Sequence, residues 1–276
     1  MVAFASGDCP TKQEKLKRAF LWGRRLADYL TRTFNNPFLS VALSHVYLPF
    51  LLYPSCPTMY AGFRYTSLNC TPEFHSIGGS TDSRALCPDL RELLVDLAID
   101  LLSLSSSSPS SQWKGEATAI TDRVRKRLIE MVQGKVPAEQ MVRTIELNKD
   151  IAEYKSSDGP VHAALATMSE TEKSLLRQRS RISFIHIVPQ KQGKSAQSAV
   201  QKKRRDCHTA SLATVCEKSL AVDFAYYLEH HYLSPLTHAL SPLRLPSVDR
   251  VFCDARKIVQ RLQHRQPSLS TLWAQT

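Results

Sequence analysis

Glycine is scarce in this sequence, providing 9 of its 276 residues. A glycine-rich phosphate-binding loop and a turn-dense all-β barrel both need more glycine, so neither is expected. The seven cysteines are widely spaced and include no C-x-x-C pair. This pattern fits reduced thiols in the cytosol or nucleus better than a disulfide framework. A zinc site at Cys207, His208 and Cys216 would lack a fourth ligand at a usual spacing.

The chain also lacks a long apolar run. The most apolar stretch, residues 39–53, is too short to span a bilayer and contains His45 and Pro49. Its β-branched and aromatic residues suit buried strands instead. No long apolar segment follows a basic start at the N-terminus, so a signal peptide is not expected. We therefore expect no membrane partner.

Positive charge is what the sequence has in excess. Lysine and arginine number 36 against 25 acidic residues, a formal charge of +11, while an apolar fraction of 43% supports a folded core. Residues 173–205 carry ten basic and no acidic side chains, which leaves about +1 for the rest of the chain. A basic surface of this kind points to polyanions, with nucleic acid the first choice.

Hydrophobic periodicity predicts an α+β fold that becomes more helical toward its C-terminus. Two strands are expected within 38–65, around a turn at 53–58, and a serine-rich loop at 103–111 is expected to break the chain. Helices are predicted over residues 13–34, 88–104, 116–133, 160–168, 222–240 and 248–263. Further strands are predicted near 143–147 and 182–188, and an exposed loop over 189–205.

Several segments, in order, resemble the family B DNA polymerases, particularly the delta/zeta-type and herpesvirus-type enzymes. WGRRLADYL at 22–30, HVYLPFLL at 45–52 and MYAGFRYT at 59–66 are similar to a helix, a K-V-Y-x-P-[FY]-L-L strand and a K-K-R-Y-A-G turn of that family. Cys87-Pro88 looks like the C-P of its R-R-D-N-C-P-L, which opens the thumb. These matches together are far more specific than any of them alone.

The resemblance continues downstream of the first helices. IELNKDIAEYKSSDGPVHAALA at 145–166 is similar to a thumb stretch, E-L-T-K-x-x-x-D-Y followed by H-V-x-L-A. RISFIHIV at 181–188 and VDFAYYLEHHYLSPLTHAL at 222–240 match two later thumb segments. The resemblance implies the C-terminal part of a polymerase palm, helix plus strands, over residues 1–86, and a mainly helical thumb over 87–276. It also implies a nucleotidyltransferase that adds deoxynucleotides to a primer.

The family's catalytic motif, Y-G-D-T-D-S, does not occur in this sequence. In the parent polymerase these carboxylates hold Mg²⁺ ions that flank the attacking 3′-oxygen and the leaving pyrophosphate. Asp8 follows the similar strand at residues 1–4 and is interpreted as a loop aspartate. We therefore predict that the chain alone binds no metal ion and is inactive, with the ligands supplied by an upstream segment.

The turn that carries K-K-R-Y in the family departs from the pattern here. Residues 54–60 read P-S-C-P-T-M-Y, so the lysines that reach the primer's minor groove are missing. His45 stands where the family has lysine, and Ser83 where it has the first arginine of R-R-D. Full polymerase activity is therefore not expected.

The DNA-contacting candidates near the turn are Tyr60, Gly62, Arg64 and Arg84. Gly62 would allow close approach to the primer strand, or would be a hairpin glycine with positive φ. Tyr60 would lie near the primer end or be a half-buried strand residue. Arg64 and Arg84 would contact phosphates or only water.

Downstream candidates are basic. Lys149 takes the place of the family's thumb lysine and is expected to contact a phosphate, or to be a solvated lysine. The cluster in the 189–205 loop is interpreted as a phosphate-tracking surface, a nuclear import signal or a solvated loop. Its members are Lys191, Lys194, Lys202, Lys203, Arg204 and Arg205. His230, His231 and Glu229 could form a metal site, but a tyrosine-rich helix that packs one face on the core is the preferred interpretation. Asp223 is predicted to be the N-cap of that helix.

The leading hypothesis is a fragment of a family B DNA polymerase that binds primer–template duplex DNA in the nucleus. The upstream polymerase segment or a processivity factor would be its protein partner. The alternative is a non-enzymatic duplex-DNA-binding or polymerase-accessory protein derived from a polymerase. A third hypothesis is a scaffold that binds partners through the leucine face at 90–102.

Overall fold

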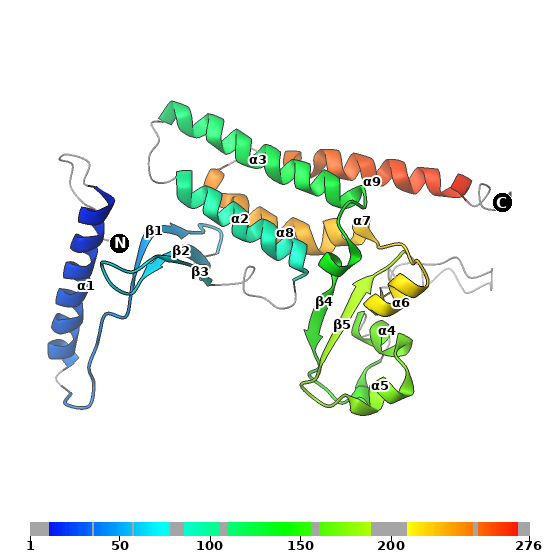
Figure 1. Ribbon diagram of the computed structural model, residues 1–276, viewed down its shortest axis with the longest axis horizontal. Helices are drawn as coiled ribbons and strands as arrows, with labels where there is room; N and C mark the ends of the chain where they lie inside the picture. Colours follow the sequence, from blue (N-terminus) through cyan, green and yellow to red (C-terminus); the bar gives the residue numbers. More distant parts are fainter. Residues whose placement is uncertain are drawn as a thin grey trace.

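The computed structural model describes residues 11–34, 36–56, 58–77, 86–104, 110–155, 160–188, 209–244 and 248–269. It confirms the predicted α+β class. A layer of long helices carries two small antiparallel sheets, which lie on the same side of the layer at its two ends (Figure 1). Within the described residues, no helix is both long and apolar enough to cross a membrane.

The first unit combines helix α1 (Lys12–Phe34) with strands β1 (Val46–Leu52), β2 (Tyr60–Tyr65) and β3 (Glu73–Ile77), which pair in the order β1-β2-β3. Thr11 and Glu14 form a capping box at the start of α1, because each side chain accepts a hydrogen bond from the other residue's backbone N–H. Leu16 and Phe20 of α1 pack with residues of β1 and β2. Strand β3 was not predicted, since its short E-F-H-S-I run shows little apolar alternation.

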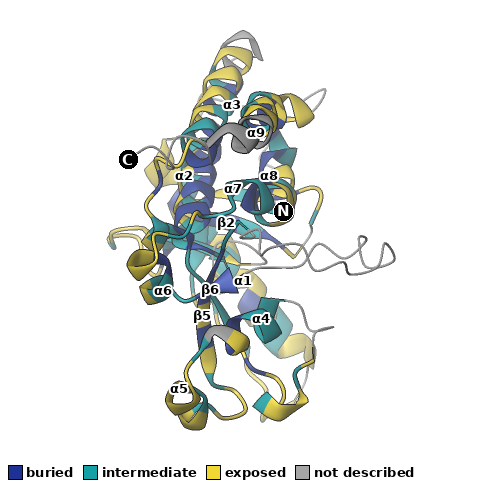
Figure 2. Cartoon of the chain, turned by 90° about the vertical axis from the view of Figure 1, so that its right-hand side faces the viewer, coloured by how far each residue is buried: buried dark blue, intermediate teal, exposed yellow. Residues whose placement is uncertain are grey.

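The helical layer contains α2 (Pro88–Leu104), α3 (Ser110–Val132), α7 (Phe224–Tyr227), α8 (Leu233–Leu240) and α9 (Asp249–Leu269). The α2 leucines predicted to form one face are buried, from Leu90 to Leu102, in the core of this chain (Figure 2). The hypothesis of a scaffold that binds partners through that face is therefore wrong. Gly134 has a φ of 73° just after α3, as a helix-ending glycine should.

The predicted helix over 222–240 is interrupted. A π-helical turn, Leu228–Tyr232, separates α7 from α8. The wider turn shifts the helical register by a residue, so that Tyr227, Leu228 and Tyr232 are all fully buried. Sequence periodicity assumes 3.6 residues per turn and does not register this shift.

The second unit contains strands β4 (Arg143–Glu146), β5 (Arg181–His186) and β6 (Thr209–Ala210), with helices α4 (Pro160–Thr167), α5 (Glu170–Leu175) and α6 (Leu212–Glu217). The predicted strands and the helix at 160–168 are confirmed. Helices α5 and α6 were missed because each is a six-residue segment with a serine N-cap and little apolar periodicity. Single 3₁₀ turns occupy Ala138–Met141, Ile151–Glu153 and Ser241–Leu243.

The largest apolar core joins the first sheet to the helical layer. Tyr53, Met59 and Ala61 belong to the same buried cluster as Leu90 and Leu94 of α2. A separate small core, built around Leu147, Ile182 and Phe184, stabilises the second unit. The first sheet is thereby fixed to the helices, while the second unit has packing of its own.

Candidate nucleic-acid interface

Three of the predicted DNA-contacting residues share one face of the first sheet. Tyr60, Gly62 and Arg64 occupy every second position of β2, so all three lie on the same face of the sheet. The same face carries three rings paired across the strands, Tyr47, Phe50 and His75. We call these six residues the aromatic face. The opposite face of the sheet packs against α1 and α2.

The rings of the aromatic face contact one another. The Tyr60 ring centroid lies 5.6 Å from that of Tyr47 and 5.5 Å from that of Phe50. The Tyr47 hydroxyl lies 2.8 Å from His75 Nδ1, within hydrogen-bonding distance. Phe50 is 45% exposed, and Tyr60 is half-buried. The face therefore presents a partly exposed aromatic surface that is held in place by its own contacts.

Gly62 is required by the neighbouring strand. A Cβ at this position would lie 2.8 Å from the Pro49 carbonyl oxygen and 3.1 Å from Tyr47 Cδ1. The strands approach closely here because the β1–β2 register shifts between Tyr47 and Phe50. Gly62 does not have a positive φ, so the hairpin-glycine alternative is wrong.

Arg64 is held by an ion pair across the sheet. Its Nη2 lies 2.5 Å from Glu73 Oε2, and the arginine side chain is 29% exposed. Hydrogen bonding to the guanidinium lowers the pKa of the Glu73 carboxyl. The guanidinium is therefore positioned at the surface of the aromatic face with its charge fixed in place.

Lys149 lies in the loop after β4, at the outer end of the second unit. The Tyr154 hydroxyl accepts hydrogen bonds from the backbone N–H groups of Asn148 and Lys149, at 2.9 and 3.3 Å. Lys149 Nζ lies 5.7 Å from the centroid of the Tyr154 ring, a cation–π contact. The structure thus places Lys149 apart from the aromatic face, although the loop after β4 lies on the same side of the helical layer as the first sheet (Figure 1). Arg84 and the candidates from Lys191 to Arg205 lie outside the described residues.

The tyrosine-rich segment is a packing element, as predicted. The Asp223 carboxylate accepts a hydrogen bond from the Tyr226 backbone N–H at 2.9 Å, which confirms the predicted N-cap. The buried Tyr227 hydroxyl donates to the Met141 carbonyl oxygen at 2.5 Å and accepts from the His186 N–H at 3.3 Å. These bonds tie α7 to β5 and to the 3₁₀ turn before β4.

Beside Tyr227, three residues form what we call the histidine junction. His231 Nε2 lies 3.1 Å from Arg143 Nη1 and 3.2 Å from His186 Nε2. Because arginine can only donate, His231 Nε2 accepts the hydrogen bond from Arg143, and His186 Nε2 lies within hydrogen-bonding distance of the same nitrogen. Burial, and next the Arg143 charge, lower the pKa of His186 to about 3 and of His231 to about 2. Both imidazoles are therefore neutral.

A second cluster, the acid junction, was not anticipated from the sequence. The fully buried Asp89 accepts a hydrogen bond from the Tyr232 hydroxyl at 2.6 Å and forms an ion pair with Arg127. Cys87 Sγ lies 3.6 Å from the same hydroxyl, and burial raises the pKa of the Cys87 thiol. The available signal was the C-P-D run, since an acid just after a proline suits the first turn of a helix.

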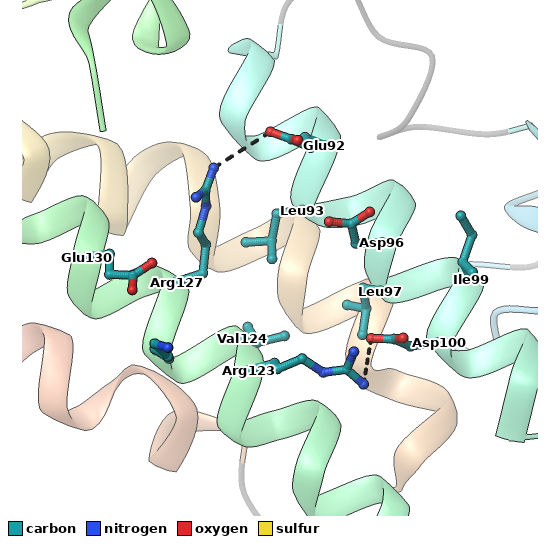
Figure 3. A pocket seen from close by; sticks show the side chains of 11 residues that line it. Glu92, Leu93, Asp96, Leu97, Ile99, Asp100, Arg123, Val124, Arg127 and Glu130 are labelled. Carbon is teal, nitrogen blue, oxygen red and sulfur yellow. Dashed lines mark ion pairs between the residues drawn. The ribbon is translucent and has the colours of Figure 1, made fainter. Parts of the chain in front are cut away.

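A surface hollow of about 410 Å³ lies between α2 and α3 (Figure 3). Its two arginines pair with carboxylates of the hollow, Arg123 with Asp100 at 3.0 Å and Arg127 with Glu92 at 3.6 Å. Burial raises the pKa of the Asp100 carboxyl. These two ion pairs link α2 to α3 across the hollow.

No group of described residues fits the Mg²⁺ ions of the implied polymerase chemistry. Within that part of the chain, no three His, Cys, Asp or Glu side chains gather so that they could hold a metal ion. Glu229 binds Arg256 with both carboxylate oxygens, at 2.7 and 3.0 Å, while His231 contacts His186. The residues of the suggested zinc site at Cys207 and His208, and Asp8, lie outside the described residues.

Comparison with known proteins gives a single family. The sequence model described as DNA polymerase family B matches residues 9–243. A search of curated proteins finds no match. Among solved structures, the family B DNA polymerase from the hyperthermophilic archaeon Pyrobaculum calidifontis is 16% identical, with a TM-score of 0.48. That match covers 78% of this chain and 24% of the archaeal one, so the chain corresponds to about a quarter of its length.

Proposed function

Because this chain belongs to DNA polymerase family B, we propose that it forms the C-terminal palm and the thumb of such a polymerase and binds primer–template duplex DNA. We assign residues 1–86 to the palm and residues 87–276 to the thumb. The parent enzyme would be of the delta/zeta or herpesvirus type, adding deoxynucleotides to a primer in the nucleus. Its carboxylates would come from a segment outside this sequence, or from a separate chain.

The arrangement of the two candidate regions carries this proposal. Tyr60, Gly62 and Arg64 share the aromatic face, and the loop after β4, which carries Lys149, lies on the same side of the helical layer as the first sheet (Figure 1). A duplex lying along that side would meet both regions. Phosphate contacts from Arg64 and Lys149 would position the duplex without reading its sequence.

Arg64 can exchange its present partner for a phosphate. Its ion pair with Glu73 is partly exposed, with Glu73 69% accessible, and such pairs contribute only about 0–1 kcal/mol. A phosphate offers the guanidinium a bidentate acceptor of higher charge. Glu73 therefore competes with DNA for Arg64 and weakens binding to it.

The direct test measures binding to a fluorescently labelled primer–template duplex between 50 and 200 mM salt. Arg64→Ala and Lys149→Ala should each weaken binding and lower the salt slope by about 0.9, the value for one lost phosphate contact. Glu73→Ala is the matched control, because it removes the same ion pair but frees the arginine. It should bind duplex at least as tightly as the unmodified chain. Unchanged slopes in both basic variants would contradict the proposal.

A second experiment tests whether the chain can catalyse nucleotide incorporation. We expect no nucleotide incorporation by this chain with Mg²⁺, since the sequence contains no Y-G-D-T-D-S motif. A polypeptide that carries the family's upstream carboxylate motifs should restore incorporation when it is mixed with this chain. Incorporation by the chain alone would refute the assignment as a partial polymerase. Duplex binding without restored incorporation would favour the alternative, a polymerase-derived accessory protein.

A further inference from the structure

Helix α1 has two different faces. Its inner face packs on the first sheet through Leu16 and Phe20, and Ala27 on the same face is also buried. The fit is close at Gly23, where an added Cβ would lie 2.9 Å from the Leu43 side chain. The Thr31 hydroxyl accepts a hydrogen bond from the Val41 N–H at 2.9 Å. These contacts fix which side of α1 points outward.

The outward side carries alternating cations and aromatic rings. Six residues spaced three and four apart fall on one line opposite the buried face. We call this line the outer seam, and its members are Lys15, Arg18, Trp22, Arg25, Tyr29 and Arg32. Trp22 is 50% and Tyr29 65% exposed, and α1 lies at the margin of the molecule in Figure 1.

Helix α1 has a strong excess of positive charge. The helix contains seven basic and two acidic residues, and the Glu14 carboxylate is engaged in the capping box with Thr11. Within the described part of the chain, no ion pair joins an α1 cation to a carboxylate. Arg25 instead lies over the Trp22 ring, with its Cζ 5.3 Å from the ring centroid. The seam therefore has a net positive charge available to a polyanion.

We infer that the outer seam binds single-stranded nucleic acid. Trp22 and Tyr29 would stack on unpaired bases, and Arg18, Arg25 and Arg32 would contact phosphates. From Lys15 to Arg32 the seam is about 26 Å long at 1.5 Å per residue. That length matches about eight nucleotides at a stacked spacing of about 3.4 Å.

Several features favour a single strand over other anionic partners. Bases in a duplex are already stacked on each other, so rings fixed on a rigid helix gain little from them. An acidic peptide would satisfy the arginines but would not use two rings that alternate with them. The seam lies across the sheet from the aromatic face, because α1 covers the other side of the sheet. This site is therefore separate from the proposed duplex site and does not depend on it.

The test uses the full chain and a labelled twelve-nucleotide oligo-dT, with binding followed by fluorescence anisotropy. Trp22→Ala combined with Tyr29→Ala should weaken binding at least tenfold. The matched control is Leu21→Ala, because Leu21 is 49% exposed on the same helix beside the seam but has no ring to stack on a base. For the charges, Arg25→Gln should weaken binding severalfold and Arg24→Gln should not, since Arg24 is exposed but faces elsewhere.

Two further measurements separate this site from its alternatives. Duplex affinity should be unchanged in the Trp22 and Tyr29 variant, whereas Arg64→Ala should leave oligo-dT binding unchanged. Inorganic polyphosphate and polyglutamate, which have no bases, should compete poorly with oligo-dT. Equal competition by either polyanion, or normal oligo-dT binding by the Trp22 and Tyr29 variant, would overturn the inference. If polyglutamate competed with oligo-dT and polyphosphate did not, the seam would instead be assigned to binding an acidic protein.

Discussion

The π-helical turn at Leu228–Tyr232 contributes to two polar junctions of opposite character, one around the buried Asp89 and one around the buried His186. Tyr232 leads to the acid junction, where the Asp89 carboxylate is balanced by Arg127. His231 leads to the histidine junction, where Arg143 faces two neutral imidazoles. The first joins α2, α3 and the turn, and the second joins β4, β5 and the turn. The acid junction therefore depends on an intact charge pair, whereas the histidine junction depends on both imidazoles staying unprotonated.

The largest expected effect comes from removing the buried carboxylate. Asp89→Ala should lower the free energy of unfolding by about 3 kcal/mol, because it leaves the buried Tyr232 hydroxyl without its acceptor and Arg127 with only the exposed Glu92. Urea denaturation of the variant measures this change. Glu92→Ala removes an exposed partner of the same arginine and should cost less than about 0.5 kcal/mol. A loss below about 1 kcal/mol for Asp89→Ala would contradict the role given to the acid junction.

As the pH falls, the histidine junction should be the first part of the comparison to lose its stabilising effect. The pKa values of His186 and His231 lie at about 3 and about 2 in the folded chain, below the ordinary value of 6.5. The unfolded chain therefore takes up protons below pH 6.5 that the folded chain does not. The contribution of the two neutral histidines to stability is fully present above that pH. The free energy of unfolding should therefore fall by about 2–4 kcal/mol between pH 7 and 5. Urea denaturation at several pH values measures the loss.

A double variant sharpens this prediction. Replacing both junction histidines, His186→Phe with His231→Gln, should remove most of the loss between pH 7 and 5. His238→Gln is the control, since His238 is exposed on α8. Carboxylates such as Glu73, whose pKa is lowered, contribute only below their ordinary value of 4.5 and leave this window clear. An equal pH dependence in the double variant and the unmodified chain would refute the junction as its source.

The smallest effect is expected at the surface of the same turn. Glu229 forms a bidentate pair with Arg256 of α9, and both side chains are about one-third exposed. Arg256→Met should cost no more than about 1 kcal/mol, and added salt should reduce the difference. A loss of unfolding free energy as large as that of Asp89→Ala would contradict the expected difference between buried and exposed ion pairs.

Much of the fold was predictable from the sequence because its long helices have regular apolar faces. The leucine spacing of α2 predicted both its bounds and its burial, and Gly134 marked the end of α3. The elements that were missed depend on tertiary context. Strand β3 exists because β2 offers it a hydrogen-bonding edge, and the π-helical turn arises where Tyr227 and Tyr232 must both reach the core.

The candidate interface was only partly readable from the sequence. Alternation along a strand places Tyr60, Gly62 and Arg64 on one face, and the structure has this arrangement. The Glu73 partner of Arg64 and the Pro49 carbonyl beside Gly62 come from strands whose pairing cannot be read from spacing alone. The cations of α1 were hidden in the overall charge, because acidic residues elsewhere cancel them.

The core shared by Met59, Ala61 and Leu94 has a consequence for how the molecule unfolds. Each side of residue 86 supplies part of the apolar surface on which the other side packs, so loss of either part exposes the other. We expect the first sheet and the helical layer to open as one cooperative unit. Amide hydrogens of Ala61 and Leu94 should then exchange with the same opening free energy, although the residue numbers suggest two separate parts.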